Sequence, residues 1–154
     1  MPADSVHDTK HTLNELLVEL FNHILFLEEQ NLIDQGIRLS MTEVHTLESI
    51  EKSSTKTMSD IAKRLLVTQG TLTVSVNRLV KKGFVWRQRD VEDKRIMRLE
   101  LTPVAKEVLK VHDRFHASMI DSLIADMHVD DDVNLMMSLE RIMDYFKRIA
   151  KAKP

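Results

Sequence analysis

The chain has 154 residues, of which 43% are hydrophobic and 30% are charged, and its formal net charge is −2. These values predict one soluble, globular unit and exclude a disordered chain. The sequence contains no cysteine and no apolar run of membrane-spanning length, and its first ten residues lack the apolar segment that a signal peptide has. We therefore expect a cytoplasmic protein without disulfides, thiol chemistry or membrane association.

The first helix is expected over residues 10–33. Three glycines and three prolines leave few turns, so most of the chain should be helical. In this first segment apolar residues recur every three or four positions and form one stripe, which Asp34-Gln35-Gly36 ends. A stripe this wide favours packing against a partner subunit or the rest of a helical bundle. Its members are Leu13, Leu17, Leu20, Ile24 and Leu27.

Three short helices are predicted next. A capping box formed by Ser40 and Glu43 begins the second helix, which ends near residue 51. The hydroxyl of Thr57 caps the third helix, and that of Thr68 caps the fourth after a tight turn. The last two helices have the spacing of a helix-turn-helix.

A β-hairpin follows the fourth helix. Strands are expected over residues 84–88 and 96–101, and they flank a charged loop at residues 90–95. A helix-turn-helix followed by such a hairpin, or wing, is a winged helix-turn-helix, which places its second short helix in the major groove of DNA.

The remainder of the chain is again helical. Thr102-Pro103 begins a fifth helix that extends to about residue 127, and a sixth helix with a wide apolar face follows Asp130 to Asp132. The expected fold is mainly α with a small β-hairpin, in the order α-α-α-α-β-β-α-α. We expect residues 1–154 to form a single unit and an intertwined homodimer. Its helical dimerisation region would be residues 10–35 and 102–153, and its DNA-binding lobe residues 40–101.

Charge is concentrated in this lobe. From Thr55 to Leu101 there are eleven Lys and Arg residues and five Asp and Glu residues, a local charge of +6, so the remainder carries −8. A basic segment on an acidic body is typical of a protein that presents one surface to a polyanion. A charge imbalance without function is the alternative interpretation.

The DNA-contacting surface is predicted from helical periodicity. If Leu72, Val76 and Leu79 point inward, the opposite face of the fourth helix can contact base edges and phosphates. In the wing, Arg95 can enter the minor groove, and the Asp93 carboxylate can hold its guanidinium in one rotamer. The other basic side chains of the wing, Arg98 among them, are expected to contact phosphates. Ordinary polar surface is the alternative. The expected DNA-binding residues are Thr68, Gln69, Gly70, Thr71, Thr73, Val74, Asn77, Arg78, Lys81, Arg87, Arg89, Asp93, Lys94 and Arg95.

These features resemble the MarR family of transcriptional regulators over nearly the whole chain. The resemblance rests on the order of elements, the wing motif Asp90-x-x-Asp93-x-Arg95 and the helix start Leu101-Thr102. It implies a homodimer that binds a palindromic operator in double-stranded DNA. Val91 departs from the family pattern, because many wings have proline there, and this leaves the turn of the wing undetermined.

Five stretches of the sequence narrow the resemblance within that family. They are Phe21-Asn22, Glu28-Glu29-Gln30-Asn31-Leu32, Met41-x-Glu43-x-His45-Thr46, Val67 to Thr73 and Arg114-Phe115-His116-x-x-Met119. In these stretches the chain resembles FabT-type repressors of fatty acid synthesis. This resemblance implies control of fatty acid biosynthesis genes, with long-chain acyl groups on acyl carrier protein as the corepressor.

An acyl chain requires an apolar tunnel, which we expect between the dimerisation helices and the DNA-binding lobe. The wide apolar faces are rich in methionine, which adapts to ligands of variable shape. Apolar stripes at helical spacing also arise from ordinary core packing, which is the alternative. The expected lining is Ile24, Leu27, Val44, Leu47, Val111, Phe115 and Met119.

The histidines predict a different effector site. His112 and His116 are four residues apart and project from one face of the fifth helix. With His45 and Glu28 or Glu29 they resemble a zinc site of the AdcR-type, zinc-sensing branch of the MarR family. The match is partial, since no cysteine is present and the residue before His45 is not a carboxylate. Zinc is therefore the alternative effector. Two other roles of these side chains remain open, namely hydrogen bonding between helices and binding of the polar end of an acyl or pantetheine group.

The sequence argues against an enzyme. It contains no glycine-rich phosphate loop, nucleophile elbow or thiol, and no spacing that would place serine, histidine and aspartate together. No cofactor is required. A helical scaffold that only binds proteins is a further alternative, but it would leave the basic hairpin unexplained.

Overall fold

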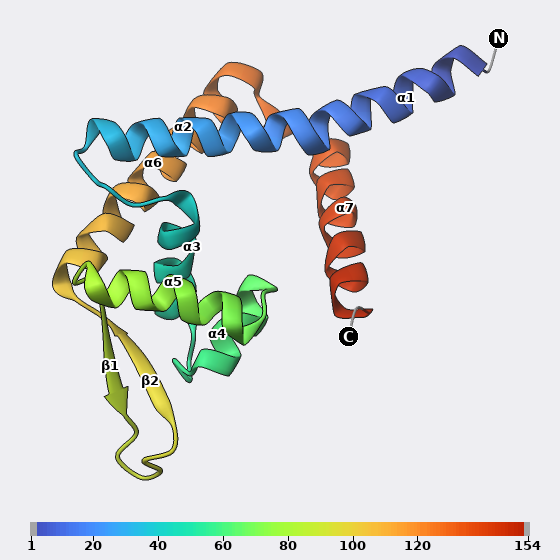
Figure 1. Ribbon diagram of the computed structural model, residues 1–154. Helices are drawn as coiled ribbons and strands as arrows, with labels where there is room; N and C mark the ends of the chain where they lie inside the picture. The colour runs from blue at the N-terminus through green and yellow to red at the C-terminus, as the bar shows by residue number, and fades with distance from the viewer. Residues whose placement is uncertain (1–2, 153–154) are drawn as a thin grey trace.

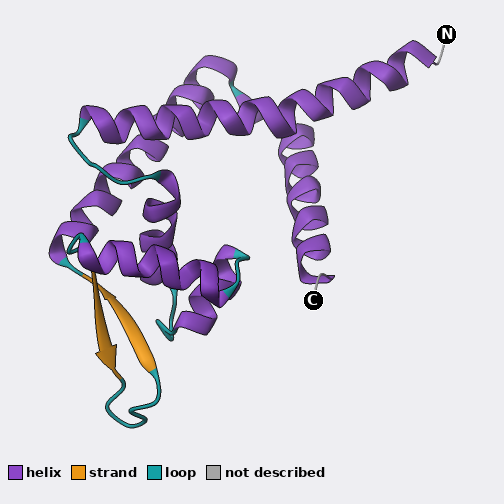
Figure 2. Cartoon of the chain, viewed as in Figure 1, coloured by secondary structure: helices purple, strands orange, loops and turns teal. Residues whose placement is uncertain are grey.

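The computed structural model describes residues 3–152. This part of the chain is mainly helical, with one two-stranded sheet (Figure 2), which confirms the predicted fold class and order of elements. The predicted unit covers residues 1–154, and the predicted dimerisation region ends at residue 153. Their terminal residues, 1–2 and 153–154, lie outside the described residues. None of the described helices is long and apolar enough to cross a bilayer.

A single long helical rod forms the N-terminal part (Figure 1). It runs through α1 (Ala3–Glu15), the π-helical turn η1 (Leu16–Leu20) and α2 (Phe21–Asp34). The backbone stays right-handed helical at Glu15 and Phe21, so the segments are continuous. The rod begins before the expected residue 10, and Gly36, with φ of 71°, turns the chain after it.

The helix-turn-helix consists of α4 (Met58–Leu65) and α5 (Gln69–Lys81), and α3 (Met41–Lys52) precedes it. The three predicted caps are confirmed. The side chains of Ser40, Thr57 and Thr68 each accept a hydrogen bond from the backbone N–H three residues later. The Ser40–Glu43 capping box is complete, because Glu43 also accepts from the Ser40 N–H at 2.9 Å.

The wing is an antiparallel hairpin of β1 (Val85–Arg89) and β2 (Met97–Leu101). Val85 pairs with Leu101, and alternation of side chains buries Val85, Leu99 and Leu101 on one face of the hairpin. Both strands begin one residue later than expected, and β1 ends one residue later. The hairpin extends from the lobe below α5 in Figure 1.

The lobe has one apolar core. Helices α3, α4 and α5, the wing strands and the first turns of α6 (Pro103–Met127) contribute to it, so α5 is held rigidly by its inner face. Its fully buried side chains are Leu32, Val44, Leu47, Ile50, Ile61, Leu72, Val76, Leu79, Val85, Leu99 and Ala105.

The C-terminal helix α7 (Val133–Ala152) follows the short helix η2 (Val129–Asp131) and stands apart from the lobe (Figure 1). No residue of α7 is buried, although its apolar face includes Leu139, Ile142 and Phe146. These residues and the apolar stripe of the N-terminal rod are exposed in the single chain. Contiguous apolar surface of this extent marks an interaction site.

Candidate nucleic-acid interface and effector sites

The outer face of α5 is free to meet a ligand. Leu72, Val76 and Leu79 are buried as predicted, and they fix the orientation of the helix. Every residue that we predicted on the outer face is exposed. These residues are Thr68, Gln69, Gly70, Thr71, Thr73, Val74, Asn77, Arg78 and Lys81.

Local hydrogen bonds limit what the three threonines of this face can offer. The Thr73 hydroxyl donates to the backbone carbonyl of Gln69 at 2.7 Å. Thr73 therefore offers DNA its methyl group and an acceptor oxygen rather than a donor. The hydroxyls of Thr68 and Thr71 are 3.0 Å apart, and Thr68 also caps the helix. Base-edge donors are thus left mainly to Gln69, Asn77 and the basic residues.

Asp90 determines the turn of the wing. Its carboxylate accepts the backbone N–H groups of Glu92 and Asp93, both at 2.9 Å, and an N–H from Arg98. These hydrogen bonds, with that of Asp93 the strongest, lower the pKa of Asp90. These hydrogen bonds close the loop although Val91 stands where many MarR wings have proline. The Val91 side chain does not help to hold the turn, because it is almost fully exposed.

Arg95 lies at the tip of the wing and is held by Asp93. Its Nε and Nη2 donate to the two carboxylate oxygens of Asp93, each at 3.0 Å, and its backbone N–H donates to the same group. The Arg95 side-chain hydrogen bond lowers the pKa of Asp93. The Arg95 side chain is 91% exposed, so the guanidinium is oriented but open to a partner.

The other wing cations differ in their surroundings. Arg89 and Lys94 are exposed, as a phosphate contact requires. Arg87 is also exposed, but it donates to Asn77 of α5. Arg98, which we expected to contact phosphate, is instead half-buried and donates to Asp90 and to the carbonyl of Thr55. Its role is to tie the wing to the lobe, and sequence spacing alone did not reveal these partners.

The four candidate metal ligands lie together at the junction of three helices. Glu28 of α2 and His112 of α6 are both 3% exposed. Glu28 Oε1 lies 2.6 Å from His116 Nε2 and 3.4 Å from His112 Nε2, and the two Nε2 atoms are 3.2 Å apart. His45 of α3 brings a ring nitrogen within 4.8 Å of Glu28 and His112. We call these four residues the Glu-His cluster.

The Glu-His cluster fits a zinc ion. Tetrahedral zinc with bonds of about 2.0–2.1 Å separates its ligand atoms by about 3.3 Å. Two of the three measured separations match this value, and only the Glu28–His116 pair must widen. Burial lowers the pKa of His112 and the adjacent His116 lowers it further, which favours the neutral, metal-binding ring. The buried Nδ1 of His112 has no hydrogen-bond partner among the described residues.

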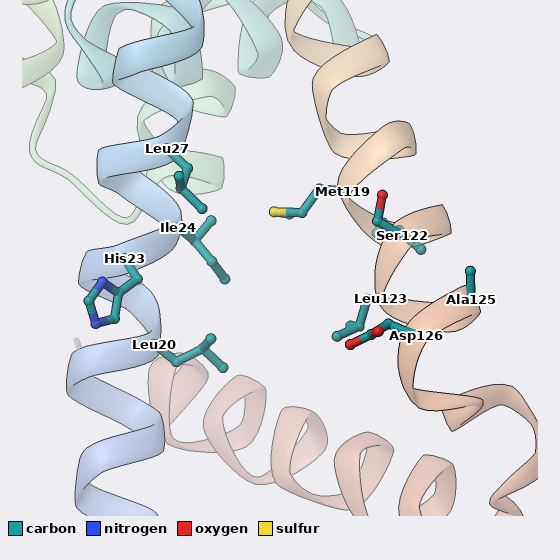
Figure 3. Close-up of a pocket in the computed structure, with 10 residues that line it drawn as sticks. Leu20, His23, Ile24, Leu27, Met119, Ser122, Leu123, Ala125 and Asp126 are labelled. Atoms are coloured by element: carbon teal, nitrogen blue, oxygen red, sulfur yellow. The ribbon is translucent and has the colours of Figure 1, made fainter.

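An apolar groove lies between the N-terminal rod and the second half of α6 (Figure 3). Its volume is about 810 Å³, within the range of small-molecule sites. Leu20, Ile24 and Leu27 are directed toward Met119 and Leu123 across it. We refer to it as the α2–α6 groove. The rest of its lining is His23, Ile120, Ser122, Ala125 and Asp126.

The structure gathers only some of the predicted ligand-lining residues around one groove. Ile24, Leu27 and Met119 line the α2–α6 groove, but Val44 and Leu47 are fully buried in the lobe core, where α3 packs between α5 and α6. Val111 and Phe115 are half-buried and lie outside the groove. The missed residues Leu20 and Leu123 each stand four positions from a predicted one, so helical spacing would have revealed them.

Comparisons with known proteins agree with this geometry. The sequence model of the MarR family matches residues 39–97. The chain is similar to Streptococcus pneumoniae FabT in a crystal structure with DNA, with 33% identity and a TM-score of 0.82. That match covers 91% of this chain and 99% of FabT.

Two curated regulators match a shorter stretch. The transcriptional regulator AdcR of Streptococcus pneumoniae is 28% identical over 106 residues, which are 68% of this chain and 70% of AdcR. The regulator SarZ of Staphylococcus saprophyticus is 29% identical over 94 residues, which are 61% of each chain. Members of this family are DNA-binding regulators rather than enzymes. The chain belongs to the MarR family of winged helix-turn-helix transcriptional regulators.

Proposed function

We propose that the protein is a repressor of fatty acid biosynthesis genes that binds a palindromic operator as a homodimer. The similarity to FabT, whose crystal structure contains DNA, over 91% of the chain carries this proposal. In the operator complex α5 lies in the major groove, and Arg95 reaches the minor groove. The two lobes must be about 34 Å apart to meet one face of the duplex.

The proposed corepressor is a long-chain acyl group carried by acyl carrier protein. The α2–α6 groove supports this proposal, because its lining is mainly aliphatic and because Met119 adapts easily to a flexible chain. The groove joins the rod to α6, which also enters the lobe core. An acyl chain changes operator affinity only if it binds better to the conformer in which the lobes have the spacing of the operator.

A titration of operator binding tests this proposal. The purified protein is mixed with a labelled fatty-acid promoter fragment, and long-chain acyl carrier protein is added, with the unacylated carrier as the control. We expect the acylated form to tighten binding and the unacylated form to have no effect. An Ile24→Trp variant, which fills the groove, should bind DNA but lose the response. An unchanged affinity for wild-type protein would reject the acyl effector.

A second candidate function is a zinc-responsive regulator, and the Glu-His cluster favours it. Glu28, His45, His112 and His116 would hold the ion, which would supply a positive charge that neutralises the buried Glu28 carboxylate. These ligands belong to α2, α3 and α6. Binding would therefore fix the dimerisation helices relative to α3, which packs directly on α5 through a Thr46–Ser75 hydrogen bond of 3.1 Å.

Zinc binding is tested directly by calorimetric titration of the metal-free protein. We expect His116→Ala, which removes a half-exposed ligand, to weaken binding at least tenfold if this function is correct. His128→Ala is the matched control, because His128 is exposed at the end of α6 and distant from the cluster. Equal zinc affinities for wild type and both variants would eliminate the Glu-His cluster as a metal site.

A further inference from the structure

A hydrogen bond connects the wing to the outer face of α5. The Nη2 of Arg87, in the middle of β1, donates to the side-chain Oδ1 of Asn77 on α5. Arg87 pairs with the buried Leu99, and alternation places it on the same face of the hairpin as Val85. The strand therefore directs this arginine toward α5, unlike its neighbours Trp86 and Gln88.

The chemistry of arginine determines which way the Asn77 amide faces. A guanidinium has only donors, so only the amide oxygen can face it. The amide nitrogen, with its two hydrogens, must then point in the other direction. It has no hydrogen-bond partner among the described residues, and Asn77 is exposed on the face of α5 that meets DNA. Without Arg87 the amide could rotate and offer either its oxygen or its nitrogen.

We propose that Arg87 is a positioning residue for sequence readout: it orients Asn77 so that α5 presents a hydrogen-bond donor to an acceptor on a base edge in the major groove. Guanine O6 and N7, adenine N7 and thymine O4 are the acceptors available there. Arg87 acts through Asn77 rather than as an independent phosphate contact, which is the role that we had expected for it. The inference rests on DNA binding through α5 and is independent of the effector.

Base discrimination by single variants tests this assignment. The probe is the duplex of highest affinity that wild-type protein selects from a random-sequence pool, with each base pair of one half-site then replaced in turn. Asn77→Ala identifies the pair that Asn77 reads, because discrimination there should fall about tenfold. Arg87→Ala should lose discrimination at the same pair and to a similar degree. The double variant should lose no more than either single one.

Arg89→Ala is the matched control, since Arg89 is also an exposed arginine of β1 but does not contact Asn77. As a phosphate contact it should weaken binding to all duplexes alike and reduce the slope of log affinity against log salt by about 1. The assignment of Arg87 is overturned if Arg87→Ala behaves like Arg89→Ala and keeps the discrimination that Asn77→Ala loses. It is also overturned if Asn77→Ala alters discrimination at no base pair. Failure of the wild type to select any duplex would instead contradict the proposed DNA-binding function.

Discussion

Arg95 is the residue of the wing whose geometry is most clearly prepared for DNA. Asp93 fixes its guanidinium through two hydrogen bonds while the side chain remains 91% exposed. Because this rotamer is held before binding, little side-chain entropy is lost when the arginine enters the minor groove. We therefore expect Asp93 to increase operator affinity by holding Arg95, without contacting DNA itself.

Arg95→Ala should weaken operator binding by about 1–3 kcal/mol and leave the folded state unchanged. Fluorescence anisotropy of a labelled operator measures the affinity, and thermal denaturation measures the stability. Lys110→Ala is the control, because Lys110 is exposed on α6 and forms an exposed ion pair with Glu107. If Arg95→Ala and Lys110→Ala bind the operator equally well, the wing has no part in recognition.

Glu43 connects the start of α3 to the end of α5. It accepts hydrogen bonds from the Ser40 N–H and from Lys82, whose Nζ lies 2.8 Å from both carboxylate oxygens. Burial raises the pKa of Glu43, but the hydrogen bonds from Lys82 and Ser40 outweigh it, and the pKa lies below its usual value of 4.5. The charged form is therefore the one that stabilises the fold.

The acid dependence of stability should reveal this carboxylate. Since the pKa of Glu43 is lower in the folded than in the unfolded chain, its contribution is present above the unfolded value of 4.5 and is lost as the pH falls through the folded value. Wild type should lose more unfolding free energy between about pH 7 and about pH 3 than Glu43→Gln does. Urea denaturation followed by Trp86 fluorescence measures the difference. Glu107→Gln, at an exposed site, should keep the wild-type pH dependence.

At the scale of elements, the sequence predicted where capped helices begin better than it predicted irregular geometry within a helix. Ser40, Thr57, Thr68 and Thr102 all cap the helices that they were expected to cap, because an N-cap is a local interaction between residues close in sequence. The π-helical turn at Leu16–Leu20 was not predicted, since no side-chain signature marks it. A capping residue therefore predicts the start of a helix reliably, whereas an irregular turn inside a helix leaves no comparable signature in the sequence.

The candidate functional residues were predictable only where all of them lie on a single helix or strand. The outer face of α5 follows from helical periodicity, and all of its predicted residues are exposed. The assignment of Val44 and Leu47 to a ligand tunnel was wrong, because periodicity identifies an apolar face but not whether protein or ligand covers it. The partners of Arg87 and Arg98 lie on other elements, so only the folded chain reveals them.

The turn of the helix-turn-helix stores strain at Leu66. This residue ends α4 in the left-handed region, with φ of 56°, and its side chain is 74% exposed. A left-handed non-glycine residue costs about 1–2 kcal/mol, whereas glycine adopts this conformation without the steric cost. Leu66→Gly should therefore raise the unfolding free energy by up to about 1 kcal/mol, after the greater entropy of glycine in the unfolded chain is subtracted.

Urea denaturation measures this effect, with Lys63→Gly as the matched control. Lys63 is exposed within α4, where glycine should lower stability by about 1 kcal/mol. A loss of stability in Leu66→Gly comparable to that in Lys63→Gly would show that the left-handed turn carries no strain.

At the scale of the whole molecule, the uncovered helices require a partner. Apolar side chains of α7 are exposed, and a concave surface between the N-terminal rod and α7 is lined by Leu13, Leu17, Ile142 and Phe146. A second copy of the chain would bury these faces, as the dimeric assembly proposed above requires. We expect the acidic excess outside residues 55–101 to keep this body away from the duplex, so that only the two basic lobes approach it.

Phe146→Glu should separate the protomers, because it places a charge in the apolar face that a second copy covers. Light scattering should then give the mass of one chain, 17.9 kDa, where wild type gives twice that value. Lys147→Glu, at the next position and thus turned by about 100° from Phe146 around α7, should remain dimeric. Each separated protomer keeps the core of its DNA-binding lobe and can bind one half-site. The second half-site is no longer bound at high effective concentration, because no second lobe is attached. The affinity for the full operator should thus fall about a hundredfold or more, whereas the affinity for a half-site duplex should equal that of wild type. A monomeric wild type with full operator affinity would contradict the twofold arrangement altogether.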